Sequence, residues 1–151
     1  MKILIINGPN LNMLGKREPE HYGSQALNEI NREIEDNAAT LGIDVEFFQS
    51  NIEGEIINII HGAKNRDTSG IILNAGAFTH YSYAIHDAIT SIDNDIPVVE
   101  VHLSNIHKRE EFRHKSVLAD ACIGQVSGFG KHSYIMALYF FKMTEDFNGG
   151  I

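Results

Sequence analysis

The segment Pro97-Val98-Val99-Glu100-Val101-His102-Leu103-Ser104-Asn105 decides the fold. Its β-branched and apolar residues predict a strand that is buried on both faces. Glu100 and His102 interrupt this run near its C-terminal end, and both point to the same face because side chains alternate along a strand. A carboxylate at this spacing could orient the imidazole and increase its basicity. A purely structural buried ion pair would explain the two residues equally well.

Strand and helix patterns alternate on both sides of this segment. The other four predicted strands are Lys2–Ile6, Ile43–Phe48, Gly70–Asn74 and Ala119–Val126. Helices are predicted from Ser24, as a cap, to about Leu41; from a capping box at Ser50–Glu53 to about Asn65; from about Tyr81 to Ile92; and from about His132 to Met143. Leu11–Gly23 is expected to be a long functional loop, and Lys108–Arg113 one or two helical turns.

Alternating β and α units with short connections predict an α/β fold in three layers, a parallel sheet with helices on both faces. Five strands suit the flavodoxin-like, doubly wound order 2-1-3-4-5. A length of 151 residues fits a single domain over residues 1–151.

Composition narrows the classes of partner. The formal net charge of −8 argues against non-specific binding to nucleic acid or to an anionic membrane. No apolar run approaches the roughly 20 residues of a membrane span, and Lys2 begins a strand pattern rather than a signal peptide. The single Cys122 lies in an apolar run, which favours a packed core thiol, allows no internal disulfide and fits a reducing cytoplasm.

Polar residues follow three of the predicted strands. They are Asn10 and Asn12 after the first strand, Asn74 and His80 around the turn after the third, and His102, Ser104 and Asn105 at the end of the fourth. Ligands of open α/β sheets bind outside the carboxyl ends of the strands, so these residues predict a binding site there. Each residue also has a local explanation: Asn10 and Asn12 as turn formers, His80 in bonds at a helix start, and Ser104 as a cap.

Several chemistries lack their sequence patterns. There is no G-x-G-x-x-G after the first strand, no G-x-x-x-x-G-K-[ST], and no G-x-S-x-G. The eight histidines include no H-E-x-x-H and no pair whose spacing dictates coordination, so we expect no metal.

Acid–base chemistry on a small anion remains. Arg17 and Tyr22 share the loop after the first strand, and a nearby guanidinium favours a phenolate that could act as a base. A surface aromatic would explain Tyr22 equally well. His102 could donate a proton to a leaving group, and the backbone amides of Leu103 and Ser104 could hold a carboxylate.

Three motifs carry a family resemblance. Gly8-Pro9-Asn10-Leu11-Asn12-Met13-Leu14-Gly15, followed by Arg17-Glu18-Pro19 and Tyr22-Gly23, resembles the opening signature of type II 3-dehydroquinate dehydratases. Asn74-Ala75-Gly76-Ala77-Phe78-Thr79-His80 is similar to the second motif of that family, and Glu100–His107 with Arg109–His114 is similar to the third. Met13 stands where Leu is commoner, and Ser127 stands where many members have Cys.

The resemblance implies a flavodoxin-like fold and a hydro-lyase. That enzyme would remove water from 3-dehydroquinate by reversible anti elimination through an enolate, without metal, cofactor or imine, giving 3-dehydroshikimate in the shikimate pathway. By resemblance, Tyr22 is the base, Arg17 lowers its pKa, Asn12 positions a water on the enolate, and His102, supported by Glu100, protonates the leaving hydroxyl.

The resemblance also assigns binding roles and an assembly. Asn74, His80 and Arg113 would bind ring hydroxyls, and the Leu103 and Ser104 amides the substrate carboxylate. Asp87 would reach the site of a neighbouring subunit in a trimer, and trimers would build a homo-oligomeric dodecamer. A flavin- or phosphate-binding module on the same fold is the alternative, because fold alone does not determine function.

Overall fold

Five parallel strands form the central sheet of the protein. The computed structural model describes residues 1–16, 19–22, 24–92 and 95–146, with the backbone alone for residues 19, 22 and 146. The strands are β1 (Lys2–Asn7), β2 (Asp44–Gln49), β3 (Gly70–Asn74), β4 (Val98–His102) and β5 (Gly124–Ser127). Their order is β2-β1-β3-β4-β5, and all neighbours are parallel, which confirms the predicted topology.

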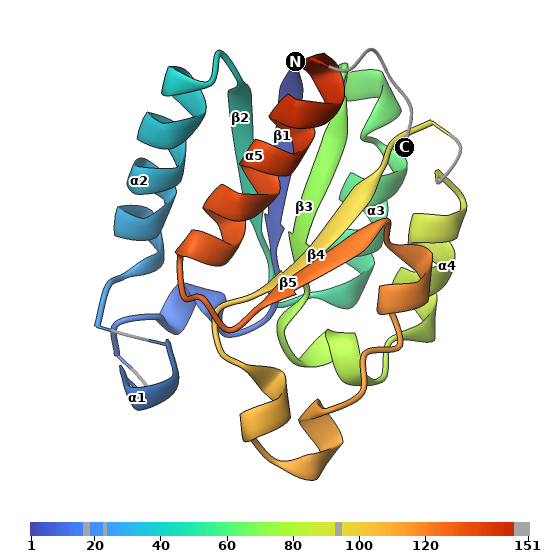
Figure 1. Cartoon of the computed structure of the whole chain (residues 1–151). Helices are drawn as coiled ribbons and strands as arrows, with labels where there is room; N and C mark the ends of the chain where they lie inside the picture. Colours follow the sequence, from blue (N-terminus) through green and yellow to red (C-terminus); the bar gives the residue numbers. More distant parts are fainter. Residues whose placement is uncertain (17–18, 23, 93–94, 147–151) are drawn as a thin grey trace.

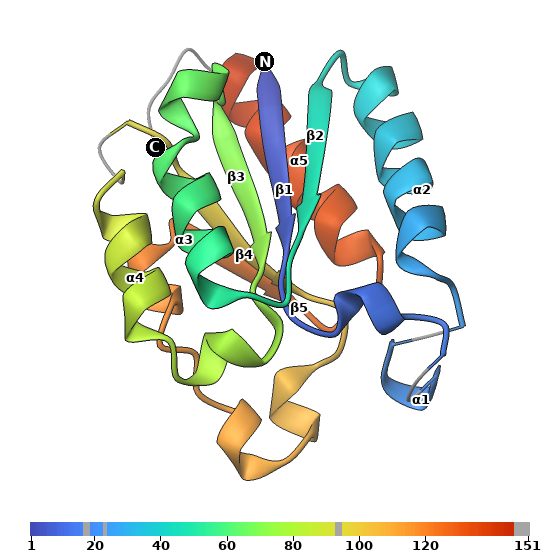
Figure 2. The same ribbon diagram turned by 180° about the vertical axis from the view of Figure 1, so that it is seen from behind.

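Helices cover both faces of this sheet. They are α2 (Leu27–Thr40), α3 (Glu53–His61), α4 (Tyr83–Thr90) and α5 (His132–Asp146), while the short helix α1 (Pro19–Tyr22) lies in the loop after β1. Figure 1 shows α2 and α5 in front of the sheet, and Figure 2 shows α3 and α4 on the opposite face. Since both faces are covered, β1, β3 and β4 are buried along almost their whole length, as parallel strands usually are.

Alternation along the strands divides the apolar side chains into two cores. Ile3, Ile5, Val99 and Val101 pack towards α2 and α5. Leu4, Ile6, Leu73 and Val98 pack in the other core, together with α3 and α4 side chains. Glu100 and His102 have the same parity as Val98 and therefore belong to the α3–α4 face. Cys122 packs partly buried against that core, as predicted.

Two predicted boundaries were wrong because of local hydrogen bonds. Ser24 does not cap α2, which begins at Leu27, where the Glu29 carboxylate accepts from the amide of Ala26. The predicted strand from Ala119 begins only at Gly124, and residues 119–121 form a 3₁₀ turn. The Ser116 hydroxyl accepts from the amides of Leu118 and Ala119. This cap holds the turn and competes with strand pairing.

The other two differences concern the loop Leu11–Gly23 and the capping box. The loop contains a 3₁₀ turn at Leu11–Met13 and the short helix α1. At the start of α3, the Ser50 hydroxyl accepts from the amide of Ile52 rather than from Glu53, and the helix ends at His61.

The turns that follow β1, β3 and β4 meet at the lower edge of the sheet in Figure 1. The amide of Gly8 donates to the carbonyl of Asn74 at 2.7 Å. A Cβ atom at Gly8 would collide with the backbone of Ala75, so only glycine permits this approach. The close contact of these turns brings their polar side chains to one place.

Candidate active site

Glu100 and His102 form a buried hydrogen-bonded pair at the end of β4. The two side chains lie on one face of the strand, as their spacing predicts, and His102 Nε2 donates to Glu100 Oε2 at 2.7 Å. Glu100 is fully buried and His102 is 6% exposed. Because Nε2 is bonded to Glu100, Nδ1 is the ring nitrogen left to contact a ligand. His102 lines a pocket at this edge of the sheet.

Three donors surround the Glu100 carboxylate. Besides His102, the Ser116 hydroxyl donates to Oε1 at 2.6 Å, and the Gln125 side-chain amide donates to Oε2. Burial raises the pKa of Glu100, but the hydrogen bonds and the charge of His102 outweigh it and hold the pKa below its ordinary value. Glu100 is therefore an ionised carboxylate at neutral pH.

His80 lies beside His102 and reaches the pocket from the 3₁₀ turn Gly76–His80. The two rings stack with centroids 6.5 Å apart and planes 18° apart. His80 Nδ1 donates to the carbonyl of Lys115 at 2.8 Å, which leaves Nε2 as the acceptor of the neutral ring. Burial lowers the pKa of His80, so the ring is neutral at neutral pH.

The pocket is a concave site at this edge of the sheet that opens partly to solvent. Its polar lining comes from Asn10, Asn74, His80, His102, Ser104, Arg109 and Arg113, and its apolar lining includes Leu11, Leu14, Leu103 and Ile106. Among the described residues that line it there is no Asp or Glu, while two guanidinium groups do line it. The pocket is therefore suited to an anion.

The two arginines follow β4: Arg109 comes directly after the 3₁₀ turn Ile106–Lys108, and Arg113 ends the 3₁₀ turn Glu111–Arg113. Arg109 Nη1 donates to the Ser104 hydroxyl at 3.3 Å. Arg113 Nε donates to the Glu110 carboxylate at 2.5 Å, and its guanidinium lies 4.6 Å from the centre of the Phe112 ring. The sequence identified Arg113 as a site residue but not Arg109, although Arg109 belongs to the same cluster of basic residues.

Asn74 is held by a buried hydrogen-bond chain that the sequence did not reveal. Its Nδ2 donates to the Tyr134 hydroxyl at 2.8 Å, and that hydroxyl donates to Asn7 Oδ1 at 2.6 Å. The Asn74 Oδ1 accepts from the amide of Gly76 at 3.2 Å. This chain of bonds links β1, β3 and α5 and fixes the orientation of the one member that lines the pocket.

The remaining predicted residues stand apart from the pocket or outside the described part. Asn12 is exposed and does not line the pocket, whereas Asn10 does line it and has the left-handed backbone of a turn former. Asp87 on α4 has an 83% exposed side chain that contacts His86. Arg17 and the side chain of Tyr22 lie outside the described residues.

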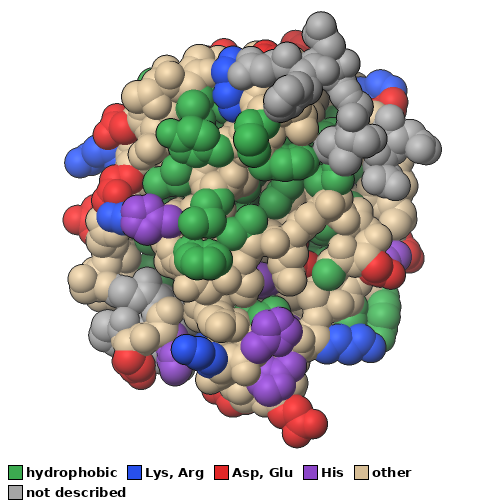
Figure 3. Space-filling view, in the orientation of Figure 1, with side chains coloured by type: hydrophobic (Ala, Val, Ile, Leu, Met, Phe, Trp, Pro, Cys, Tyr) green, Lys and Arg blue, Asp and Glu red, His purple; other side chains and the backbone are tan. Residues whose placement is uncertain are grey.

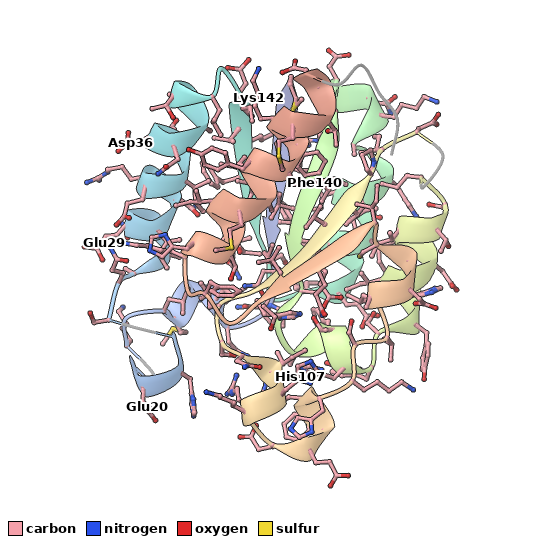
Figure 4. All side chains as sticks on the ribbon, in the orientation of Figure 1. Glu20, Glu29, Asp36, His107, Phe140 and Lys142 are labelled. Atoms are coloured by element: carbon pink, nitrogen blue, oxygen red, sulfur yellow. The ribbon has the colours of Figure 1, made fainter. Side chains whose placement is uncertain are left out.

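Helix α1, which contains the backbone of Tyr22, adjoins the same site. Glu20 and His21 line a second, more open cavity together with Ser104 and Arg109, which also line the pocket. Figure 4 shows Glu20 and His107 at the lower edge of the molecule, and Figure 3 shows histidine side chains grouped at that end. In the part of the chain that is described, no group of three His, Cys, Asp or Glu side chains could hold a metal ion.

Comparison with known proteins gives consistent matches along the chain. The sequence model of the family described as Dehydroquinase class II matches residues 1–142. A protein of Clostridium perfringens (strain SM101 / Type A) named 3-dehydroquinate dehydratase is 61% identical over 91% of this chain and 93% of its own length. A protein of the same name from Caldicellulosiruptor bescii is 60% identical over 96% of this chain and 99% of its own length.

Two solved structures resemble the whole fold. The type II dehydroquinase from Butyrivibrio crossotus DSM 2876 has a TM-score of 0.90 and 49% identity, covering 93% of this chain and 96% of its own. The type II dehydroquinase from Propionibacterium acnes has a TM-score of 0.89 and 38% identity, covering 94% and 96%.

Proposed function

The chain belongs to the class II dehydroquinase family, and we propose from this membership that it is a hydro-lyase that converts 3-dehydroquinate to 3-dehydroshikimate. The observation that carries the proposal is the anion-suited pocket, which has two guanidinium groups and the buried Glu100–His102 pair at one end. A carboxylated substrate meets complementary charge there, and a histidine is available for proton transfer.

The proposed reaction is an anti elimination in two proton-transfer steps. The Tyr22 phenolate removes a proton from the carbon beside the substrate ketone, and the electron pair of that C–H bond forms an enolate. Collapse of the enolate expels the hydroxyl from the next carbon, and His102 donates the proton that converts it to water. Arg17 stabilises the phenolate, and Asn12 holds a water that hydrogen-bonds the enolate oxygen.

The binding roles follow the pocket lining. Asn74, His80 and Arg113 contact ring hydroxyls, and the amides of Leu103 and Ser104 hold the carboxylate; all five residues line the pocket. Arg109 adds a second positive charge beside Ser104. Glu100 supports His102 and touches no substrate atom. The chemistry proceeds without a cofactor or metal.

Conversion of purified 3-dehydroquinate, followed by the absorbance of the conjugated enone product, tests this function. The wild-type protein should produce the enone, and His102→Gln should produce it far more slowly. A wild-type protein that leaves the substrate unchanged would contradict the proposal. A yellow protein that binds flavin mononucleotide tightly would instead support the flavin-binding alternative, which the comparisons do not favour.

The assembly is part of the same proposal. Residues 1–151 act as one catalytic domain, and the domains form trimers in which Asp87 reaches a neighbouring pocket; the trimers build a dodecamer. The exposure of Asp87 supports this role, and Met136, Tyr139 and Met143 leave apolar surface on α5 for a neighbour, 44%, 49% and 53% exposed. Light scattering on the full chain tests it, and a fully active monomer at assay concentration would contradict the shared site.

We propose that the protein is located in the cytoplasm. No helix in the described part of the chain is long and apolar enough to cross a bilayer. The single cysteine permits no internal disulfide, which fits a cytoplasmic enzyme. Cell fractionation with antibody detection tests the location.

A further inference from the structure

The surroundings of Glu100 contain more donors than a single ion pair requires. Its carboxylate is fully buried, and its two oxygens accept three hydrogen bonds from side chains on different segments. Each of the three partners uses a donating group at this contact. A carboxylic acid would have to donate its own proton from one oxygen, and of the three partners only His102 Nε2, in its other tautomer, could accept it. The donors of Ser116 and Gln125 therefore favour the ionised form of Glu100.

Ser116 is constrained to donate. Its hydroxyl oxygen accepts from the amides of Leu118 at 3.1 Å and Ala119 at 3.0 Å, which occupy both of its lone pairs. Its single proton is then directed to Glu100 Oε1, 2.6 Å away. The residues on either side of Ser116 bond to the segment that carries His80. The Lys115 carbonyl accepts from His80 Nδ1, and the amide of Val117 donates to the carbonyl of Thr79.

Gln125 approaches the same carboxylate from the edge strand. It is paired with Glu100 in the register of β4 and β5, and its side-chain amide nitrogen donates to Oε2, the oxygen that His102 also uses. Gln125 is an exposed residue whose polar end nevertheless reaches this buried group. The edge strand therefore supplies one of the three donors to this carboxylate.

We propose that Ser116 and Gln125 are positioning residues that hold Glu100 as a carboxylate, so that His102 keeps its Nε2 proton on Glu100 and exchanges the proton on Nδ1 with the substrate. This inference rests on the proposed dehydration. The titratable and charged groups that face the cluster are His102, bonded to Glu100, and His80 and Arg113 across the pocket edge. All three are constant between the variants compared below.

The test replaces each donor separately with an apolar side chain, in Ser116→Ala and Gln125→Met. The titration of Glu100 is followed without substrate by the ¹³C shift of its side-chain carboxyl, assigned by its disappearance in Glu100→Gln. Loss of one charge-assisted hydrogen bond should move the titration midpoint up by about one to two pH units. The acidic limb of kcat should move up in the variants, with KM nearly unchanged.

Matched variants separate positioning from folding. Ser116→Thr keeps the hydroxyl and should restore the wild-type midpoint. Ser91→Ala removes a hydroxyl whose bond within the described residues is to the carbonyl of Ala88 and should leave midpoint and kcat unchanged. Should Ser116→Ala fail to fold, Gln125→Met on the exposed edge still tests the proposal.

Two results would overturn the inference. One is a Glu100 midpoint in Gln125→Met within a few tenths of a pH unit of wild type; the other is an equal loss of kcat at every pH with an unmoved acidic limb. Because the wild type is assayed alongside, an inactive wild type would overturn the proposed function instead, and the ¹³C titration would still judge the positioning role.

Discussion

Replacing His102 separates its chemical role from its structural one. His102→Gln places a side-chain amide donor within reach of Glu100 but supplies no titrating acid, whereas His102→Ala removes both donor and acid. General acid catalysis typically contributes about 10²- to 10⁴-fold, so both variants should lose kcat by that factor. The two should differ in stability.

The size of that difference follows from the bonds to Glu100. Breaking a buried ion pair typically costs about 3–5 kcal/mol, because one charge is left without a partner. Here Ser116 and Gln125 still donate to the carboxylate, so the loss is closer to one charge-assisted hydrogen bond, about 2 kcal/mol. For a chain of this size, the Tm of His102→Ala should fall by roughly 4 to 8 °C, with a much smaller change in His102→Gln.

Steady-state kinetics and thermal unfolding of the two purified variants decide the matter. Circular dichroism should show native secondary structure in both. A folded His102→Gln with near-normal kcat would remove His102 from the role of acid. Equal Tm values for the two variants would refute the reasoning that Glu100 depends on a donor from this position.

Three further predictions address other groups. Tyr22→Phe should abolish enone formation while substrate still binds by calorimetry, and Arg17→Ala should move the acidic limb of the remaining kcat/KM to higher pH; substantial turnover in Tyr22→Phe would disprove the pair. Tyr134→Phe removes the hydroxyl that bonds the buried atoms Asn74 Nδ2 and Asn7 Oδ1 and should cost about 1–3 kcal/mol in urea unfolding, with a higher KM. Burial lowers the pKa of His80, so the unfolded chain binds that proton first and stability should fall as pH drops below about 6.5; His80→Asn should flatten this slope, measured as the urea midpoint against pH.

The central strands could be predicted because β1 and β3 are continuous apolar runs and β4 is an apolar run interrupted only by Glu100 and His102. The order of the strands follows from general rules for parallel α/β folds, and it matched. The Glu100–His102 contact could also be predicted, since two residues on one strand face are neighbours whatever the rest of the chain does. These features depend on local pattern alone.

The features that escaped prediction depend on contacts between distant segments. The start of β5 is displaced because Ser116 caps the turn before it, and that hydroxyl is held in place by Glu100. The sequence gives no sign of the role of Tyr134, because its partners Asn7 and Asn74 are far away in sequence. Arg109 was one of several basic residues, and only the fold of the turns after β4 brings it to the pocket.

The bridge made by Tyr134 also has a consequence for how the chain is made. Its hydroxyl joins Asn7, 127 positions earlier, to Asn74. The side chain of Asn7 on β1 therefore gains this partner only when α5, the last helix, is in place. A nascent polypeptide on the ribosome already contains every pocket-lining side chain once Arg113 has emerged. The binding surface is nevertheless set only when α5 docks, some twenty residues later in synthesis. We therefore expect a nascent chain to gain affinity for its ligand only after α5 has packed on the assembled sheet.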